Sequence, residues 1–503
     1  MFTSRRIPAL ITSVALAIPA LAADRPLNIV LLYADDLGFG DLGSYNPQSK
    51  IPTPHLDQLA KDGLRFTDAH SSSGICTPSR YTLLTGRSHW RDFHGIDTGF
   101  SKPFFKPAQL TLPEMLRQKG YTTACIGKWH LGWDWDSIRK PDTPRDSKKH
   151  TDFDWNKAIP GGPLDHGFDH YFGDNVINFP PYAWMENDRV LTIPDTTFRN
   201  MGDVKPKEGG WECREGPAMA DWDFYQVLPT LTTKAVEYIH SRKNQEKPFF
   251  LYFPLPSPHT PIVPNDEFDN TSQAGAYGDF VVETDDSCGQ LLAALREAGL
   301  YENTLILFTA DNGSENFAYA RDAKHNHWSS GPLRGVKRDI YEGGHRVPTL
   351  LKWPGVTTAG SVTDALFAQA DLMATLANHL GFALPENSAE DSHDFMPYLK
   401  GETETSPRTT LVHNTFKDRY AIRHHDWLLV DHPTGTDRKA PGAWMEKHSY
   451  PPYTDLPVGL YNLKEDLGQR HNLAEKHPEK VNELQTLLRE IRNGNHTAPR
   501  LAK

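Results

Sequence analysis

Residues 27–36 read Leu-Asn-Ile-Val-Leu-Leu-Tyr-Ala-Asp-Asp, an apolar run that ends in two adjacent carboxylates. Pro26 precedes the run, and the apolar part has the length of a single buried strand. A run that is apolar throughout, without alternating polar residues, is typical of a parallel strand covered on both faces. The stretch therefore predicts a central strand of a parallel sheet, followed directly by Asp35 and Asp36.

Similar apolar runs recur along the chain, with helical patterns between them. The runs lie at Thr122–Ile126, Phe249–Phe253, Leu305–Thr309 and Thr349–Trp353. Apolar residues at helical spacing occupy 54–63, 111–120, 280–299 and 364–380. Strands that alternate with helices predict an α/β fold, here a doubly wound, mostly parallel sheet flanked by helices.

The pattern changes near residue 395. Segments 420–423 and 427–430 predict an antiparallel hairpin, 459–463 predicts a further strand, and 478–492 predicts a terminal helix. We therefore expect a large domain over residues 24–395 and a smaller C-terminal α+β subdomain over residues 396–503.

The first 22 residues have the order of an export signal peptide. Arg5 and Arg6 precede a mostly apolar segment from Ile7 to Pro19, and Ala20-Leu21-Ala22 is a small-x-small cleavage site. This segment is too short to span a bilayer, and no other apolar segment is long enough. We expect an exported protein, periplasmic or secreted, without a transmembrane segment.

Composition argues against some functions. The 503-residue chain has a net charge of -11 and no basic stripe, which argues against binding to nucleic acid. Its four cysteines are few for an exported protein stabilised by disulfides, and Cys125 lies in an apolar run typical of the core. An anionic ligand therefore requires a locally basic pocket within an acidic protein.

Polar residues follow four of the predicted strands. They are Asp35-Asp36, Lys128-Trp129-His130, His259 and Asp311-Asn312. In open α/β sheets, ligands bind beyond the carboxyl ends of the strands. Their coincidence predicts a functional site at one edge of the sheet.

Residues 71–80 read Ser-Ser-Ser-Gly-Ile-Cys-Thr-Pro-Ser-Arg. Thr77 is a predicted helix cap, with Pro78 at the first helical position. Cys76 is thus expected at a helix N-terminus, where the backbone favours negative charge, with Arg80 one turn further on. A nucleophile, a helix N-terminus and an arginine together predict an anion site.

The stretch Cys76-Thr77-Pro78-Ser79-Arg80 resembles the Cys-x-Pro-x-Arg motif of the type I, formylglycine-dependent sulfatases, which are arylsulfatase-like members of the alkaline phosphatase superfamily. Further segments resemble the family's other motifs in order and spacing, at residues 27–38, 127–132, 309–313 and 335–344. The resemblance spans about residues 26–355 and implies hydrolysis of a sulfate monoester. It also implies that a formylglycine-generating enzyme oxidises Cys76 before the chain folds.

The resemblance implies roles for the basic residues. The hydrate of the modified residue 76 is the expected nucleophile, steadied by Arg80, and Asp311 assists its deprotonation. Sulfate oxygens are the expected ligands of Lys128, His259 and Lys337. His259, with Lys337 beside it, is the expected acid for the leaving oxygen, and His130 is expected to bond the second hydroxyl and start elimination of sulfate.

A metal site is also predicted. Asp35, Asp36, Asp311 and Asn312 offer only hard oxygen ligands, which suit Ca²⁺ or Mg²⁺ better than zinc. The resemblance favours a single Ca²⁺, with the oxygen of modified residue 76 as a further ligand.

Histidine and tryptophan in the segments 88–94 and 321–328 suit sugar hydroxyls and sugar faces, and they favour a sulfated carbohydrate as substrate. The candidate sugar contacts are His89, His94, His325 and His327. One alternative is a phosphoester or phosphonate hydrolase of the same superfamily. Others are a non-catalytic carbohydrate-binding sulfatase relative and a hydrolase that uses the Cys76 thiol itself.

Overall fold

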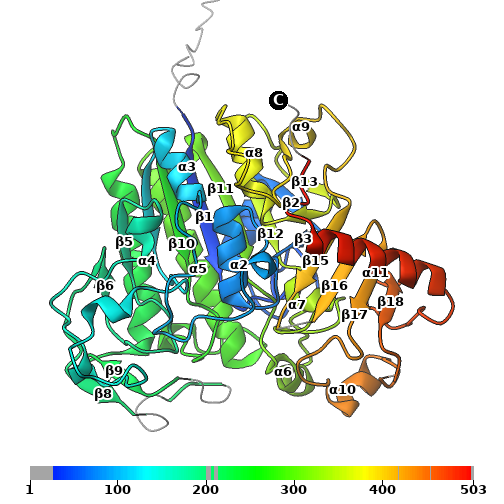
Figure 1. Ribbon diagram of the computed structural model, residues 1–503, viewed down its shortest axis with the longest axis horizontal. Coiled ribbons are helices and arrows are strands. Elements are labelled where there is room, and N and C mark those ends of the chain that lie inside the picture. Colours follow the sequence, from blue (N-terminus) through cyan, green and yellow to red (C-terminus); the bar gives the residue numbers. More distant parts are fainter. Residues whose placement is uncertain (1–25, 200–204, 209–212, 417–418, 454, 500–503) are drawn as a thin grey trace, which may run out of the picture.

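The centre of the molecule is a ten-stranded mixed sheet (Figure 1). The computed structural model describes residues 26–199, 205–208, 213–416, 419–453 and 455–499, so the predicted signal peptide lies outside the described residues. In order across the sheet the strands are β13 (Ser361–Thr363), β2 (Leu64–Phe66), β12 (Thr349–Lys352), β11 (Thr304–Ala310), β1 (Asn28–Ala34), β10 (Phe249–Pro254), β4 (Thr122–Ile126), β5 (His170–Gly173), β6 (Met185–Glu186) and β7 (Arg189–Val190).

The middle of this sheet is parallel. β11, β1, β10, β4 and β5 are neighbours and all run in the same direction. β12 was expected as a strand and is one, but it runs antiparallel to β11, as do β6 and β7 relative to their neighbours. The predicted fold class is confirmed: the sheet is large, mixed and mostly parallel in its centre.

Helices cover both faces of the sheet because both faces are apolar. Every residue of β1 is buried, with Val30 and Leu32 in one core cluster and Ile29 and Leu31 in another. The first cluster contains residues of α1 (Pro54–Asp62), α4 (Val227–Ser241) and α5 (Gly275–Glu297). The second contains residues of α2 (Cys76–Thr85), α3 (Leu112–Gln118), α8 (Asp371–His379) and α9 (Met396–Leu399). The result is a three-layer helix–sheet–helix architecture.

One predicted helix is shorter than its pattern. The sequence predicts a helix over 364–380, whereas α8 begins only at Asp371. The preceding apolar residues form β14 (Phe367–Ala368), which pairs in parallel with β3 (Ala69–His70). Pairing with another part of the chain overrides the local periodicity here.

A second, antiparallel sheet forms the C-terminal part, in the order β15 (Thr410–Asn414), β16 (Tyr420–His424), β17 (Trp427–Asp431), β18 (Gly459–Asn462). Helix α11 (Pro478–Asn493) packs Leu484 and Leu488 against one face, as Figure 1 shows for the red helix beside the orange strands. The other face packs on Ile340 and Tyr341 of the large domain. The predicted hairpin, strand and terminal helix are all present, while the boundary at 395/396 stays a prediction.

The remaining elements are short. Besides short 3-10 helices, they are the two-stranded sheet of β8 (Thr196–Phe198) and β9 (Gly216–Ala218), and the helices α6 (Ala318–His325), α7 (Glu342–His345) and α10 (Gly442–Lys447). Within the described part of the chain, none of the helices combines the length and apolarity needed to cross a membrane. The four cysteines are buried, and Cys125 lies in the core as predicted.

Candidate active site

The four polar segments predicted from strand ends do meet at one edge of the sheet. Asp35 follows β1, Lys128 follows β4 after Gly127, His259 follows β10, and Asp311 follows β11. These strands are neighbours in the order β11-β1-β10-β4 and are all parallel, so their carboxyl ends lie together. The topology therefore gathers residues that are far apart in the sequence.

Helix α2 brings Cys76 to the same edge. Cys76 is the first residue of the helix, and the residue before it, Ile75, offers no capping side chain. The prediction that Thr77 caps this helix is wrong, because Thr77 lies inside it and its hydroxyl donates to the carbonyl of His130 at 3.0 Å. Without a side-chain cap, the first backbone amides of α2 remain available to an anion.

Arg80 and Lys128 hold two of the carboxylates. The Arg80 guanidinium donates to Asp311 Oδ2 from Nη2 at 2.7 Å and from Nε at 3.1 Å, and Nη2 lies 3.5 Å from Asp35 Oδ2. Lys128 Nζ forms a short ion pair with the same oxygen of Asp35. All four side chains are fully buried, so these contacts are only weakly screened by water.

Asp36 is held by a second set of partners. Lys337 Nζ lies 2.7 Å from Asp36 Oδ1 and 2.8 Å from Oδ2, and Asn312 Nδ2 donates to Oδ1 at 2.6 Å. His259 Nε2 lies 3.6 Å from Asp36 Oδ2. The backbone of Asp36 has a left-handed φ of 62°, which lets two adjacent carboxylates point into one site.

Two buried oxygen atoms of this cluster have no hydrogen-bond partner among the described residues. They are Asp35 Oδ1 and Asn312 Oδ1. In addition, ligand atoms of Asp35, Cys76 and Asp311 lie within 4.8 Å of one another. Buried acceptors without donors are rare and point to a missing ligand. An oxygen-rich set of this kind fits a hard cation such as Ca²⁺ or Mg²⁺.

The charges of the cluster also favour a cation. Burial raises the pKa of Asp311 well above its ordinary value, and the nearby Asp35 carboxylate raises it further, although Arg80 opposes both effects. Burial acts in the same direction on Asp35, but the cations of Lys128 and Arg80 hold its pKa below the ordinary range. A divalent ion between these carboxylates would stabilise the ionised form of both.

The two predicted catalytic histidines are neutral in this environment. Burial, followed by the charge of Lys128, lowers the pKa of His130 to about 3. Burial, followed by the charge of Lys337, lowers the pKa of His259 to about 4. His130 Nε2 faces the carbonyl oxygen of Asp97 at 3.0 Å and must donate to it, so the unpartnered Nδ1 carries the lone pair. His259 Nδ1 faces the carbonyl of Thr260 at 2.6 Å, so its free lone pair lies on Nε2.

Sequence reasoning missed two aspartates near the site. Asp97 orders the loop around His130: its backbone amide donates to Thr77 Oγ1, and its carboxylate accepts from the amide of Gly132. Asp174 follows β5, is 2% exposed, and has no partner for either carboxylate oxygen within the described part of the chain. Burial raises its pKa to about 6, although Lys128 lies close enough to lower it. β5 is too short and mixed for its pattern to reveal the aspartate after it.

The interpretation of two loop histidines as sugar contacts is wrong. His89 is buried, with its ring nitrogens 3.4 Å from Ser72 Oγ and 3.2 Å from Asn414 Oδ1. His327 is buried as well, with Asp41 Oδ1 at 2.8 Å and the amide of Lys50 donating to Nδ1 at 3.4 Å. Since both nitrogens of each ring are occupied, neither can bind a sugar hydroxyl. His94, whose Nε2 lies 2.7 Å from Tyr420 Oη, and His325 stay predictions.

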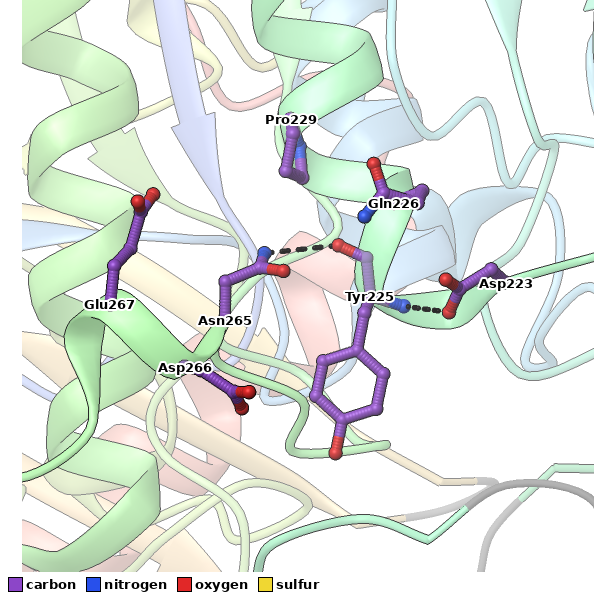
Figure 2. Close-up of a pocket in the computed structure, with 7 residues that line it drawn as sticks. All are labelled: Asp223, Tyr225, Gln226, Pro229, Asn265, Asp266 and Glu267. Atoms are coloured by element: carbon purple, nitrogen blue, oxygen red, sulfur yellow. Dashed lines mark hydrogen bonds between the residues drawn. The ribbon is translucent and has the colours of Figure 1, made fainter.

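A separate cavity of about 610 Å³ lies where α4 begins, beside the loop 265–267 (Figure 2). Figure 2 shows Asp223, Asp266 and Glu267 around it, together with Tyr225 and Asn265. None of the predicted site residues lines it. The carboxylates of Asp223, Asp266 and Glu267 repel an anionic ester, so the Cys76 site is the better candidate for binding such an ester.

Fold and site together fit a hydrolase of anionic esters: an α/β fold, a cysteine at a helix N-terminus, buried oxygen atoms suited to a cation and several buried basic groups. The family model described as Sulfatase matches residues 27–382, and the chain belongs to the sulfatase family. The protein is therefore a sulfuric ester hydrolase.

Individual relatives agree with this family. The chain is 33% identical to N-acetylgalactosamine-6-O-sulfatase of Bacteroides thetaiotaomicron, over 92% of this chain and 93% of that protein. It is 35% identical to human arylsulfatase A, over 92% and 86% of the respective lengths. A solved structure described under glycosaminoglycan metabolism by Bacteroides thetaiotaomicron superposes with a TM-score of 0.78 at 31% identity, covering 94% of this chain and all of that one.

Proposed function

We propose that this enzyme hydrolyses a sulfate monoester on a carbohydrate, with a formylglycine made from Cys76 and with one bound Ca²⁺. The observation that carries the proposal is the position of Cys76 beside the ligand atoms of Asp35 and Asp311, within 4.8 Å. Asp35, Asp36, Asp311 and Asn312 would hold the ion, together with the oxygen of the modified residue 76. When bound, calcium supplies positive charge and a fixed template for the sulfate.

The reaction proceeds in two steps, a displacement at sulfur followed by an elimination of sulfate. A hydroxyl of the residue-76 hydrate, steadied by Arg80 and deprotonated with help from Asp311, attacks sulfur, and the bond from sulfur to the sugar oxygen breaks. Lys128, His259 and Lys337 bind the sulfate oxygens while charge builds on them. The second hydroxyl then gives its proton to His130 Nδ1, the C–O bond to sulfate breaks, and the aldehyde forms, which water hydrates again for the next turnover. The free lone pair on His130 Nδ1 supports this role.

The departing sugar oxygen needs a proton. His259 Nε2 is the acid in this proposal, with the ammonium of Lys337 beside it. In the free site the pKa of His259 is about 4, so the ring has to gain a proton when the anionic ester arrives. A bound anion favours that gain, because an opposite charge raises the pKa of a histidine.

The substrate class follows from the relatives. One relative is named N-acetylgalactosamine-6-O-sulfatase, and several mammalian relatives carry a similar name at 31–32% identity. We propose a 6-sulfated N-acetylgalactosamine unit as the first substrate to test. The predicted export signal places the enzyme where such polysaccharides occur, in the periplasm or outside the cell.

The relatives and the site both count against the alternatives. The relatives named above are sulfatases, which counts against a phosphoester or phosphonate hydrolase. A non-catalytic relative would lack a nucleophile or ligands, whereas every predicted one is present. A thiol nucleophile alone would leave the unpartnered oxygens of Asp35 and Asn312 unexplained.

The proposal is tested by assaying protein co-expressed with a formylglycine-generating enzyme. Sulfate release from N-acetylgalactosamine 6-sulfate is compared with release from the 4-sulfate, and phosphate release from the 6-phosphate is the control. Asp35→Asn and Asp311→Asn should lose bound calcium and activity together, because each removes a negative charge from the ion's shell. Full activity in metal-free protein, or preference for the phosphate, contradicts the proposal.

A further inference from the structure

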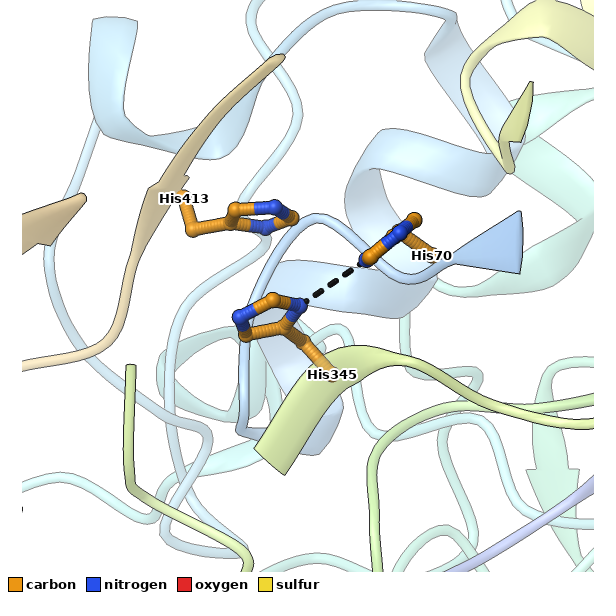
Figure 3. Close-up of side chains that lie close together, drawn as sticks. All are labelled: His70, His345 and His413. Atoms are coloured by element: carbon orange, nitrogen blue, oxygen red, sulfur yellow. Dashed lines mark hydrogen bonds between the residues drawn. The ribbon is translucent and has the colours of Figure 1, made fainter. Parts of the chain in front are cut away.

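Three buried histidines meet where the C-terminal sheet packs on the large domain. His70 ends β3, His345 ends α7, and His413 lies on β15 (Figure 3). All three are 0% exposed, and their ligand nitrogens lie within 4.8 Å of one another. This cluster, which we term the histidine triad, shares no residue with the calcium site.

The hydrogen bonds of two rings orient their inner nitrogens toward each other. His70 Nε2 lies 2.8 Å from Asp68 Oδ1, and His345 Nε2 lies 3.4 Å from the carbonyl oxygen of Ile340. Both partners are acceptors, so both Nε2 atoms donate and both Nδ1 atoms carry lone pairs when the rings are neutral. Yet the two Nδ1 atoms lie only 3.1 Å apart. Two facing lone pairs repel each other unless a proton or a cation lies between them.

His413 supplies a second, independent observation. Its ring lies over that of His345, as Figure 3 shows. The two centroids are 3.6 Å apart, and the centroid of the His70 ring is 5.2 Å from that of His413. Neither of its nitrogens has a hydrogen-bond partner among the described residues. A fully buried imidazole without partners is costly and calls for an unseen ligand.

The surroundings resemble those of histidines that bind metals. Such a histidine usually donates its outer N–H to a carboxylate or a backbone carbonyl, which fixes the tautomer and makes the inner nitrogen more basic. Asp68 and the Ile340 carbonyl do this for His70 and His345. The Glu342 carboxylate lies 4.0 Å from His70 Nε2, so negative charge is near, although Arg346 shares both carboxylates at 3.2 and 3.0 Å.

From the facing Nδ1 atoms and the unpartnered nitrogens of His413 we propose that His70, His345 and His413 bind a transition-metal ion, zinc by ligand type, separate from calcium. The lone pair of an imidazole lies in the ring plane, so binding requires the His413 ring to rotate out of its stack on His345. Imidazole nitrogens suit zinc and exclude calcium, and three of them leave a fourth position for water. The ion would join β3 and α7 of the large domain to β15 of the C-terminal sheet. Because β3 leads directly into the loop before Cys76, the triad also steadies the approach to the nucleophile.

The test measures metals in untagged, full-length protein produced in zinc-supplemented medium. Elemental analysis should find about one zinc ion per chain in addition to calcium. His413→Phe keeps a ring of similar size and should lose the zinc while retaining calcium. His393→Phe is the matched control: His393 is also buried, bonds the carbonyl of Pro407 at 3.0 Å and has an unpartnered Nε2, but it is not part of the triad.

Cobalt gives a readout that needs no variant. Wild-type protein grown with Co²⁺ should show the visible absorption of a tetrahedral nitrogen site, which an oxygen-ligated calcium site does not produce. Cys76→Ala should keep this band and the zinc, so failure of the proposed catalysis leaves the triad proposal intact. Wild-type protein without zinc or the cobalt band overturns the proposal and indicates a protonated triad, and zinc retained in His413→Phe overturns the assignment.

Discussion

At the scale of single residues, the site contains equal numbers of carboxylates and basic side chains that pair with them. The carboxylates of Asp35, Asp36 and Asp311 pair with the permanent cations of Lys128, Arg80 and Lys337. A divalent ion would give the site a net positive charge within a protein whose overall charge is -11. The site can therefore attract a sulfate ester although the protein as a whole repels anions.

The two lysines should matter about equally. Lys128→Ala and Lys337→Ala should each lower kcat/KM by roughly 10²-fold or more, because a desolvated sulfate loses one of its donors in the transition state. Lys352→Ala is a suitable control, since Lys352 is a buried lysine that ends the antiparallel strand β12 and bonds the carbonyl of Tyr301 at 3.0 Å. Steady-state kinetics of the three variants decide the matter, and an effect in Lys352→Ala as large as in the other two would contradict the assignment.

The role of His259 as an acid can be separated from mere sulfate binding. His259→Ala should slow hydrolysis of a sugar sulfate by about 10²-fold or more, because an alkoxide leaving group needs a proton. Hydrolysis of nitrophenyl sulfate, whose leaving group needs none, should fall much less. For the sugar, activity should decline as pH rises, since the pKa of the free His259 is about 4 and deprotonation removes the acid. Equal losses on both substrates would assign His259 to sulfate binding alone.

Elements position these residues through close backbone contacts. The loop after β11 turns back against α7, with the amide of Gly313 donating to the carbonyl of Gly344 at 2.9 Å. The amide of Lys337 donates to the carbonyl of Ser314 at 2.8 Å. The loop that carries the proposed metal ligands and the segment that carries Lys337 are thus fixed to each other by main-chain bonds.

Gly313 has no room for a side chain. A Cβ at this position would lie 1.9 Å from the carbonyl oxygen of Gly343, so Gly313→Ala must push the loop away from α7. We expect weaker calcium binding and a large loss of kcat, measured by calcium titration and kinetics. Gly442→Ala adds a methyl in open space and should behave like the wild type. A fully active Gly313→Ala variant would show that the loop position does not control the site.

At the scale of the whole molecule, the C-terminal sheet is bound to the large domain by apolar and ionic contacts. Ile340 and Tyr341 pack against Ala421, Leu428 and Val430 of the small sheet. Arg408 forms a buried pair with Asp371 of α8, at 2.5 and 2.9 Å. Removal of one partner of such a buried pair typically costs about 3–5 kcal/mol.

A chain that ends at residue 395 should therefore not form a stable domain. It exposes the apolar face around Ile340 and leaves Asp371 buried without its arginine. We expect aggregation during expression or a much lower thermal unfolding temperature, measured by light scattering and calorimetry. A soluble truncated protein as stable as the full chain would mean that residues 24–395 fold independently.

Much of the fold and of the candidate site could be predicted from the sequence, because the polar residues of the site follow the carboxyl ends of buried strands. β1, β4, β10, β11 and β12 lie within a residue or so of the predicted runs, and the parallel centre brings their polar residues together. Pairings that depend on packing were not predictable. The antiparallel direction of β12, the strand β14 and the Asp174 that follows β5 all depend on tertiary neighbours. His89 and His327 have the sequence context of surface loops, yet tertiary contacts with Asn414 and Asp41 bury them.

The histidine triad could not be predicted from the sequence either. His70, His345 and His413 come from three distant segments, and no spacing in the sequence relates them. Their neighbours Asp68 and Arg423 are likewise joined only in the folded molecule, at 2.7 Å.

The proposed formylglycine at position 76 can be tested by the mass of the tryptic peptide that spans residues 66–80, taken from active enzyme. The peptide over residues 120–128, which contains the buried Cys125, is the internal control and should keep its thiol. We predict a residue 76 in which sulfur is replaced by oxygen and two hydrogens are lost, together with activity that rises with the modified fraction. An unmodified thiol at position 76 in fully active enzyme would contradict it.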